Sequence, residues 1–320
     1  MKHSNSEKPP TEVAAFVDPE IELLLEGYSE IDWNEHSLPE IRRQPATVRE
    51  RALSDDVERT DYLVPGNSGV IVRVHRPKGV AGLLPCIYAI HGGGYVSKDR
   101  SYFDPRFDVW CPRLSCAGAS VEYRLAPENP YPSALEDCYS GLVWLFNNAH
   151  EIGIDRERIG VMGSSAGGGL AAALALYVRD HSELSLLFQL LLYPELDDRQ
   201  ITPSSRTETP LWSLASNEFA WKSYLGDLYG RPDVPIYAAP ARALDLSELP
   251  PGYIMVGTLD RFLDESVSFA QRLNQAGVPT DLHIYPGAPH GFDAIFSSTT
   301  VARQARKDMG IWVEQQFNRN

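Results

Sequence analysis

A serine flanked by glycines is the sequence feature that most constrains the fold of this chain. The apolar run at residues 159–162 is followed by G-S-S-A-G at residues 163–167 and then by an alanine- and leucine-rich segment. A direct turn from a strand into a helix strains the residue at its centre, and the residues two positions before and after it must be small. Gly163 and Gly167 meet this demand, so we expect a strand–turn–helix unit that raises the Ser165 hydroxyl above a sheet.

Strands and helices alternate along most of the chain. A length of 320 residues fits one large α/β domain with a small accessory part. β-branched and apolar runs predict strands at residues 70–74, 86–90, 120–123, 159–162, 186–193, 253–256 and 282–285. Helix-length segments lie at residues 131–149, 167–179, 264–276 and 300–317. This order predicts an α/β fold with a mainly parallel central sheet flanked by helices.

Two segments fall outside this alternation. Residues 1–65 form an N-terminal segment that we expect to be helical, because residues 19–31 carry apolar side chains at the spacing of one helix face. Residues 196–249 are rich in Pro, Ser, Trp and Tyr and form an insertion, helical in part at residues 216–225. This leaves two stretches for the core of the domain: residues 66–195 and 250–320.

Composition excludes several classes of protein. The chain has 29 Lys and Arg against 43 Asp and Glu, a net charge of −14, so nucleic acid is not an expected partner. We expect no metal site, since the four cysteines lack zinc-site spacing and are too few for a disulfide scaffold. The N-terminus lacks an apolar leader and no later run could span a bilayer, which predicts a cytoplasmic protein without stable membrane insertion.

A second glycine motif, H-G-G-G at residues 91–94, directly follows the predicted strand at residues 86–90. Three consecutive glycines carry an entropic cost, so this position requires close backbone approach or positive φ. In a serine hydrolase such a loop aims N–H groups at the oxygen that becomes negative during the reaction. We assign this oxyanion hole to the N–H groups of Gly92, Gly93 and Ala166; a flexible surface loop is the alternative.

A serine hydroxyl needs a base, and the base needs an acid that orients it. His290 lies after the last predicted strand, where a base can reach the carboxyl edge of the sheet, whereas His283 lies inside that strand. Asp260 ends the preceding strand and is the predicted acid. The order serine, acid, histidine is that of α/β-hydrolases.

Neighbouring residues offer less favourable choices. Ser164 occupies the x position of G-x-S-x-G, and only Ser165 has glycine two positions away on both sides. Asp264 and Glu265 come at the start of a predicted helix, where acidic residues commonly cap or balance the helix dipole.

The chain resembles bacterial esterases of the hormone-sensitive lipase family, also called family IV. The resemblance rests on H-G-G-G, on G-S-S-A-G, on Y-R-L-A-P-E at residues 123–128 and on H-G-F at residues 290–292, and it covers nearly all of the chain beyond residue 65. It implies an α/β-hydrolase core with a helical cap built from the N-terminal segment and the insertion. Three positions depart from the family pattern: Ser164, Tyr95 after the glycines, and Arg261-Phe262 after Asp260.

The resemblance also implies where the substrate binds. We expect Tyr95, Tyr193, Trp212 and Phe219 to contact it. Trp221 and Tyr224 belong to the same aromatic group in the insertion, although aromatic residues at helical spacing more often form the core of a cap.

These observations predict a carboxylesterase that hydrolyses esters with short to medium acyl chains through an acyl-enzyme. The small-molecule ester is the expected partner, with no cofactor. The alternatives are an amide, lactone or carbamate hydrolase, and a catalytically silent receptor for a small ligand, which plant gibberellin receptors resemble. A homodimer through the edge of the sheet near the last strand is expected from the habit of similar enzymes.

Overall fold

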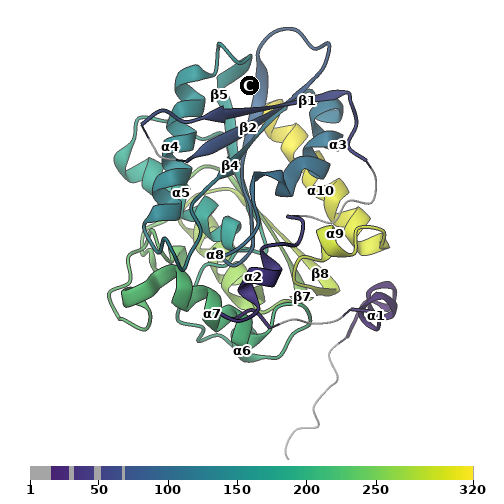
Figure 1. Cartoon of the computed structure of the whole chain (residues 1–320), viewed down its shortest axis with the longest axis vertical. Helices are drawn as coiled ribbons and strands as arrows, with labels where there is room; N and C mark the ends of the chain where they lie inside the picture. Colours follow the sequence, from purple (N-terminus) through teal and green to yellow (C-terminus); the bar gives the residue numbers. More distant parts are fainter. Residues whose placement is uncertain (1–15, 29–31, 47–51, 67–68, 320) are drawn as a thin grey trace, which may run out of the picture.

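The computed structural model describes residues 16–28, 32–46, 52–66 and 69–319. Its centre is an eight-stranded sheet in the order β1-β2-β4-β3-β5-β6-β7-β8 (Figure 1). β2 is antiparallel to both of its neighbours, and all other pairs are parallel, which confirms the predicted fold class. The strands are β1 Val57–Leu63, β2 Ile71–Pro77, β3 Leu84–Ile90, β4 Ala117–Glu122, β5 Ile154–Ser164, β6 Gln189–Leu192, β7 Gly252–Leu259 and β8 Thr280–Pro289.

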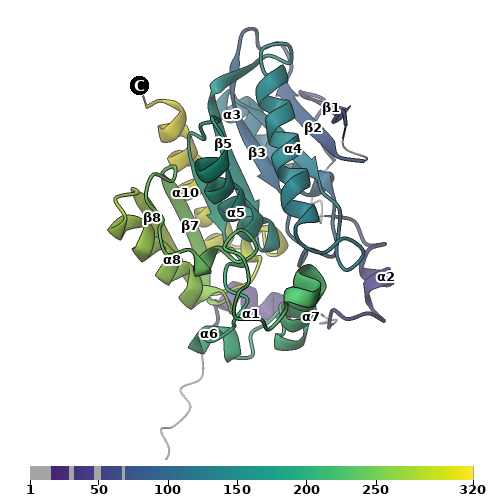
Figure 2. The ribbon, with the colours of Figure 1, turned by 90° about the vertical axis from the view of Figure 1, so that its left-hand side faces the viewer.

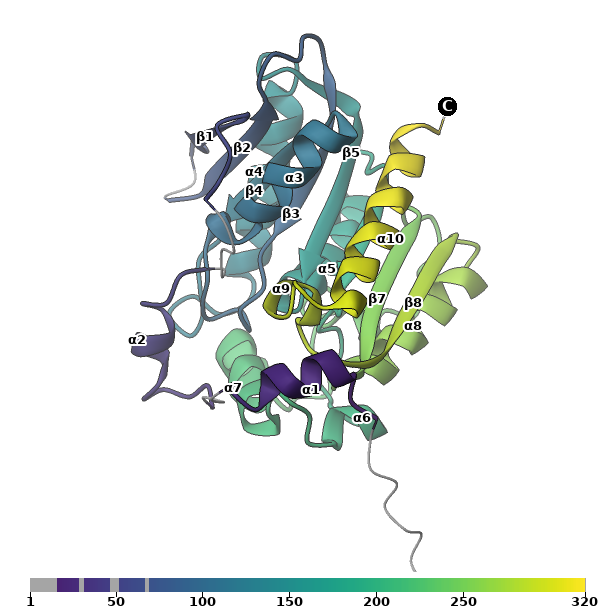
Figure 3. The same ribbon diagram turned by 90° about the vertical axis from the view of Figure 1, so that its right-hand side faces the viewer.

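Helices cover both faces of the sheet. α4, α5 and α8 pack on one face (Figure 2), and α3 and α10 pack on the other (Figure 3). The α-helices are α1 Pro19–Leu25, α2 Leu38–Ile41, α3 Asp104–Leu114, α4 Ser133–Asn148, α5 Ala166–His181, α6 Pro203–Arg206, α7 Leu214–Leu225, α8 Leu263–Gln275, α9 Phe292–Ile295 and α10 Thr300–Phe317. Across the described ranges, no helix is long and apolar enough to cross a membrane.

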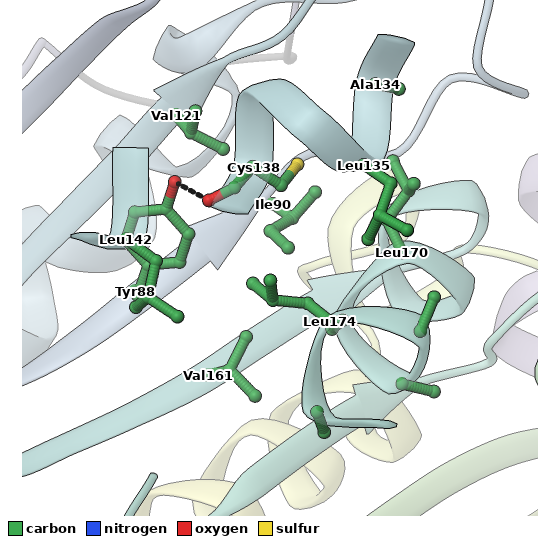
Figure 4. Close-up of a cluster of buried hydrophobic side chains, with 14 of the residues drawn as sticks. Tyr88, Ile90, Val121, Ala134, Leu135, Cys138, Leu142, Val161, Leu170 and Leu174 are labelled. Carbon is green, nitrogen blue, oxygen red and sulfur yellow. Dashed lines mark hydrogen bonds between the residues drawn. The ribbon is translucent and has the colours of Figure 1, made fainter. Parts of the chain in front are cut away.

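The core lies between the sheet and these helices. All seven residues of β3 are buried, because a central strand with helices on both faces has no solvent side. On the face of α4 and α5, side chains from both helices meet residues of β3, β4 and β5 (Figure 4). The Tyr88 hydroxyl enters this cluster and donates to the Cys138 carbonyl over 2.8 Å. All four cysteines are buried and free.

The predicted strands and helices all overlap observed ones, and residues 300–317 match α10 at both ends. The prediction that residues 1–65 are helical was wrong for the last part of this segment, because β1 pairs with β2 as an edge strand of the sheet. Its alternating but mostly polar residues gave no apolar run. α3 was also missed. The helix expected at residues 19–31 ends at Leu25 as α1, and residues 1–15, 29–31 and 47–51 lie outside the described part.

The insertion lies over the carboxyl ends of the parallel strands (Figure 2). It carries α6, α7 and two short 3₁₀ turns, η2 Gly226–Leu228 and η3 Pro240–Arg242. A residue just before α2 contacts it directly, because the Trp33 N–H donates to Ser216 Oγ over 2.9 Å. The N-terminal segment and the insertion therefore touch at the same end of the sheet.

Candidate active site

Ser165 occupies the turn between β5 and α5. Its φ of 56° and ψ of −125° form a conformation that persists only where the surroundings enforce it. Its N–H donates to the Leu192 carbonyl over 2.9 Å. Its carbonyl accepts from the N–H groups of Gly169 and Glu195 over 3.0 and 3.1 Å. The chain thus forms the predicted strand–turn–helix unit, with Ser165 at the N-terminus of α5.

Gly163 and Gly167 leave no room for a side chain at this turn. A Cβ atom on Gly163 would lie 1.9 Å from the Gly167 carbonyl oxygen. A Cβ atom on Gly167 would lie 2.1 Å from the Ile90 carbonyl oxygen. Both obstacles are backbone atoms, which cannot rotate away as a flexible side chain could. Close packing of α5 against the ends of β3 and β5 therefore requires both glycines.

Ser165, His290 and Asp260 meet although they follow three different strands, β5, β8 and β7. His290 Nδ1 lies 2.8 Å from Asp260 Oδ2, and His290 Nε2 lies 2.9 Å from Ser165 Oγ. An ionised carboxylate only accepts hydrogen bonds, so Nδ1–H donates to Asp260 and Nε2 accepts from the Ser165 hydroxyl. The Phe262 N–H donates to Asp260 Oδ1 over 3.0 Å and orients the carboxylate. This line of hydrogen bonds is arranged to withdraw the hydroxyl proton.

The two rival residues lie elsewhere. Ser164 is the last residue of β5 and its side chain is wholly buried. His283 stays within β8, where its ring stacks on that of Tyr253 with centroids 4.6 Å apart. Neither Ser164 nor His283 belongs to the line of hydrogen bonds, which joins Ser165, His290 and Asp260.

The glycine loop after β3 lies against the turn that carries Ser165. A Cβ atom on Gly92 would lie 3.2 Å from Cβ of Ser165, so the loop backbone passes directly beside this side chain. The N–H groups of Gly92, Gly93 and Ala166 form no hydrogen bond to any residue that the structure describes. Ala166 begins α5, where N–H groups have no acceptor within the helix. Three N–H donors are thereby left for an oxygen beside Ser165.

Three aromatic rings surround His290. The ring centroids of Tyr193, Phe262 and Trp212 lie 4.9, 5.1 and 6.1 Å from that of His290. The Tyr193 hydroxyl donates to Asp293 Oδ1 over 2.8 Å, which fixes the ring against the imidazole. Tyr193 and Trp212 were expected to contact substrate. Phe262 was missed, and its only signal was its place two residues after the predicted acid.

Tyr95 and Phe219, the other two expected substrate contacts, lie between the insertion and the core. Tyr95 is buried and stacks on Tyr224 of α7 with centroids 3.9 Å apart. Burial raises the pKa of Tyr95, so the phenol stays protonated. Phe219 is partly buried and packs against the main apolar cluster. The structure brings neither residue to the ring of His290.

Arg261, directly after the predicted acid, is wholly buried and holds part of the insertion. Its Nη1 donates to the Ser205 carbonyl over 2.5 Å, and its Nη2 donates to that of Thr207 over 3.2 Å. Its Nε donates to the Trp212 carbonyl over 3.0 Å. Burial lowers the pKa of Arg261 from its ordinary value, although nearby carboxylates oppose that effect. The sequence showed this residue only as a departure from the family pattern.

Asp264 and Glu265 lie in the first turn of α8, where the sequence predicts that they balance the helix dipole, but neither side chain caps the helix. Both bind the insertion. Asp264 accepts from the Ser204 N–H over 2.8 Å, and Glu265 accepts from the Leu196 N–H over 2.7 Å. These carboxylates form no metal site. No group of three or more His, Cys, Asp or Glu within the described part of the chain could hold a metal ion.

Glu195 is the least expected group near the site. It is wholly buried, and neither carboxyl oxygen has a hydrogen-bond partner among the residues that the structure describes. Burial raises the pKa of Glu195 well above its ordinary value, which favours the neutral carboxyl in the fold. Its N–H donates to Ser165 and its carbonyl accepts from the Tyr95 hydroxyl over 3.4 Å. Glu195 therefore links the turn of Ser165 to Tyr95, the residue that stacks on Tyr224 of α7.

A mainly parallel sheet with a serine at a strand–helix turn, a histidine and an aspartate at its carboxyl edge defines an α/β-hydrolase. A family model described as "alpha/beta hydrolase fold" matches residues 87–294. The chain belongs to this family, in the branch that resembles hormone-sensitive lipase.

Several known proteins similar to the chain are named esterases. Esterase LipI of Mycobacterium tuberculosis is 31% identical over 79% of this chain and 80% of its own length. Carboxylesterase NlhH of the same species is 31% identical over 88% of this chain and 91% of its own. Among solved structures, "Bacterial Heroin Esterase" has a TM-score of 0.87 and 36% identity, covering 95% of this chain and 98% of the other. The chain is a carboxylic ester hydrolase.

Proposed function

We propose that the chain hydrolyses carboxylic esters with short to medium acyl chains through an acyl-enzyme, with Ser165 as nucleophile, His290 as base and Asp260 as the acid that orients it. The observation that carries this proposal is the continuous line of hydrogen bonds from Ser165 Oγ through His290 to Asp260. No cofactor enters the proposed reaction.

In the first half of the reaction, His290 Nε2 takes the hydroxyl proton while Ser165 Oγ attacks the ester carbonyl carbon. The carbonyl oxygen becomes negative and is held by the N–H groups of Gly92, Gly93 and Ala166. His290 then gives the proton to the alkoxide leaving group, and the alcohol departs. The acyl group remains on Ser165 as an ester.

In the second half, water replaces the alcohol. His290 takes a proton from this water, the hydroxide attacks the acyl carbonyl, and the same N–H groups hold the second oxyanion. Collapse returns the proton to Ser165 Oγ and releases the carboxylic acid. Asp260 keeps the imidazole in one tautomer through both halves and balances its charge when it is protonated.

The cap supports the preference for small acyl groups. Trp212 closes over the glycine loop, because a Cβ atom on Gly94 would lie only 2.8 Å from Cη2 of the indole. The three rings around His290 occupy further space on that side. We therefore expect turnover to be fastest with acetyl to hexanoyl esters and to fall for longer chains.

The test is the release of p-nitrophenol from acetyl to dodecanoyl esters by the wild type and three variants. Ser165→Ala and His290→Ala should lower kcat by about 10⁴-fold or more with little change in folding, because the residues act as a unit. His283→Ala is the matched control and should retain wild-type turnover. Mass spectrometry after rapid quenching should find the acyl group on the peptide that contains Ser165.

Two results would contradict the proposal. Loss of turnover in His283→Ala with a normal rate in His290→Ala would overturn the assigned base. A folded wild type that cleaves no ester of any chain length would favour an amide, lactone or carbamate substrate, or a silent receptor.

A further inference from the structure

A cavity of about 330 Å³ lies beside α3, α9 and α10. Figure 3 shows these helices on the face of the sheet opposite α5. Residues of α3, α9 and α10 line it, and the chemistry proposed above uses none of its basic residues. Five basic and two acidic side chains contribute to the lining: Arg106, Arg113, Arg303, Arg306, Lys307, Asp108 and Asp293. The chain as a whole has a net charge of −14, so positive charge gathers here against the overall balance.

Both acidic groups are already paired inside the protein. Asp293 is wholly buried, and it pairs with Arg106 Nη2 over 2.5 Å and accepts from the Tyr193 hydroxyl. Asp108 is buried and pairs with Arg59. Both carboxylates are therefore occupied by arginines inside the protein.

Two of the outer cations are exposed and pair with no acidic group in the described part of the chain: Arg113 and Lys307. The Arg113 guanidinium lies over Gly310 of α10, where a Cβ atom would come within 3.5 Å of Nη2. Arg303 donates to the Ser298 carbonyl, an uncharged group that positions the guanidinium. Arg306 likewise donates to the carbonyl of a neighbouring serine. The exposed side of the cavity lining thus carries positive charge from Arg113, Arg303 and Lys307.

Aromatic side chains form the inner wall. Phe103 and Trp110 are buried, and the Arg106 guanidinium lies 5.7 and 5.3 Å from their ring centroids. Tyr102 and Ala294 continue this wall. A ligand that fits must place negative charge at the mouth and a small apolar body against these rings.

We propose that this cavity is a second binding site, separate from the catalytic one, for a small organic anion that joins a phosphate or carboxylate group to an aryl or short alkyl body. The volume is at the lower end of the range for small-molecule sites, about 300–1,000 Å³. The anionic group meets Arg113 and Lys307, and the body packs on Trp110.

The test is calorimetric titration of the full chain with phenyl phosphate and two matched probes. Inorganic phosphate carries the charge without the ring, and benzyl alcohol carries the ring without the charge. Phenyl phosphate should bind more tightly than either, and its affinity should fall as salt is raised, because exposed charges are screened.

The affinity of variants for phenyl phosphate tests whether it binds in this cavity. Arg113→Gln combined with Lys307→Gln should weaken the binding of phenyl phosphate about tenfold, because both exposed cations that meet the phosphate are removed. Lys78→Gln, another exposed lysine away from the cavity, is the control and should change nothing. Ester hydrolysis by the double variant should equal that of the wild type, which shows that the fold is intact.

Three results would overturn the proposal: no binding of phenyl phosphate at millimolar concentration, equal affinity in the double variant and the wild type, or equal affinity for phenyl phosphate and inorganic phosphate. The second result would mean that the anion binds elsewhere, for example beside Ser165.

Discussion

The turn of Ser165 and the cap beside it are fixed by different kinds of contact. At the turn, backbone atoms fill the space where side chains of Gly163 and Gly167 would stand. In the cap, one buried guanidinium, that of Arg261, donates to three carbonyl groups of the insertion. The turn therefore needs positions without side chains, whereas this part of the cap needs the side chain of Arg261.

Because of this difference, we expect the turn to govern whether the reaction occurs and the cap to govern which esters react. Any side chain at the two glycine positions would displace the nucleophile, so that part of the molecule tolerates no variation. The position of the segment at residues 205–212, and with it Trp212 over the glycine loop, depends in large part on the side chain of Arg261, which a point mutation can replace. We therefore expect changes at the turn to abolish the reaction and changes in the cap to alter which esters react.

Among changes to the contacts that support the turn and the cap, the largest effect is predicted for Gly163→Ala. The added methyl group would need the space 1.9 Å from the Gly167 carbonyl oxygen, which moves α5 or Ser165. A displacement of about 1 Å can cost 10²-fold in rate, so kcat/KM for p-nitrophenyl acetate should fall by about 10²-fold or more. Gly27→Ala is the control, because its Cβ atom would have no heavy atom closer than 3.9 Å. Near-normal activity in Gly163→Ala would contradict the argument from backbone contact.

A smaller and more selective effect is predicted for Arg261→Met. Loss of three hydrogen bonds should loosen the segment at residues 205–212 and move Trp212, while Asp260 keeps its bond from the Phe262 N–H. KM for octanoyl and longer esters should change about tenfold, and kcat for the acetyl ester by less than about threefold. Steady-state kinetics across chain lengths measures this split. Arg231→Met replaces an exposed arginine of the cap and should leave the profile unchanged; a uniform loss of kcat in Arg261→Met would argue for a purely structural role.

The smallest effect concerns Glu195, which lies where the turn and the cap meet. Burial raises its pKa in the fold, so the folded chain holds a proton that the unfolded chain releases above the ordinary value of 4.5. The stability that this carboxyl contributes is complete below pH 4.5 and is lost as the pH rises. Glu195→Gln cannot ionise, so its Tm should match the wild type near pH 4 and exceed it by a few °C at pH 8.

Thermal unfolding between pH 4 and pH 8 measures this difference. Glu314→Gln, an exposed glutamate of α10, serves as the control and should show a constant offset from the wild type. A wild type that is equally or more stable than Glu195→Gln at pH 8 would mean that the carboxylate finds a partner in the fold.

Structural features that depend on residues close together in the sequence could be predicted. The glycine-flanked serine, the three glycines after a strand and the histidine after the last strand each depend on residues within a few positions, so the fold class and the meeting of Ser165, His290 and Asp260 follow from strand order. α10 was predictable for the same reason, since its apolar residues repeat at helical spacing.

Features that depend on distant partners could not. β1 is half polar and becomes a strand only because β2 offers it an open edge. α3 contains Pro112, a residue type that is unfavourable inside helices. Arg261 and Glu195 give no local sign of burial, because charged residues are usually exposed and each is buried by contacts more than 29 residues away.

The insertion leaves the sheet after β6 and returns at β7, and these two strands are paired neighbours. Because these strands are parallel, the insertion runs from the carboxyl end of β6 back to the amino end of β7. The hydrogen bonds between the two strands, and not the insertion, hold them about 5 Å apart. In evolutionary terms, the segment behaves as a cassette: it can be lengthened, shortened or exchanged between homologous genes without altering the distance between the strands that carry Ser165 and Asp260. A lineage can thus acquire new substrates by recombination in this segment while inheriting its catalytic residues unchanged.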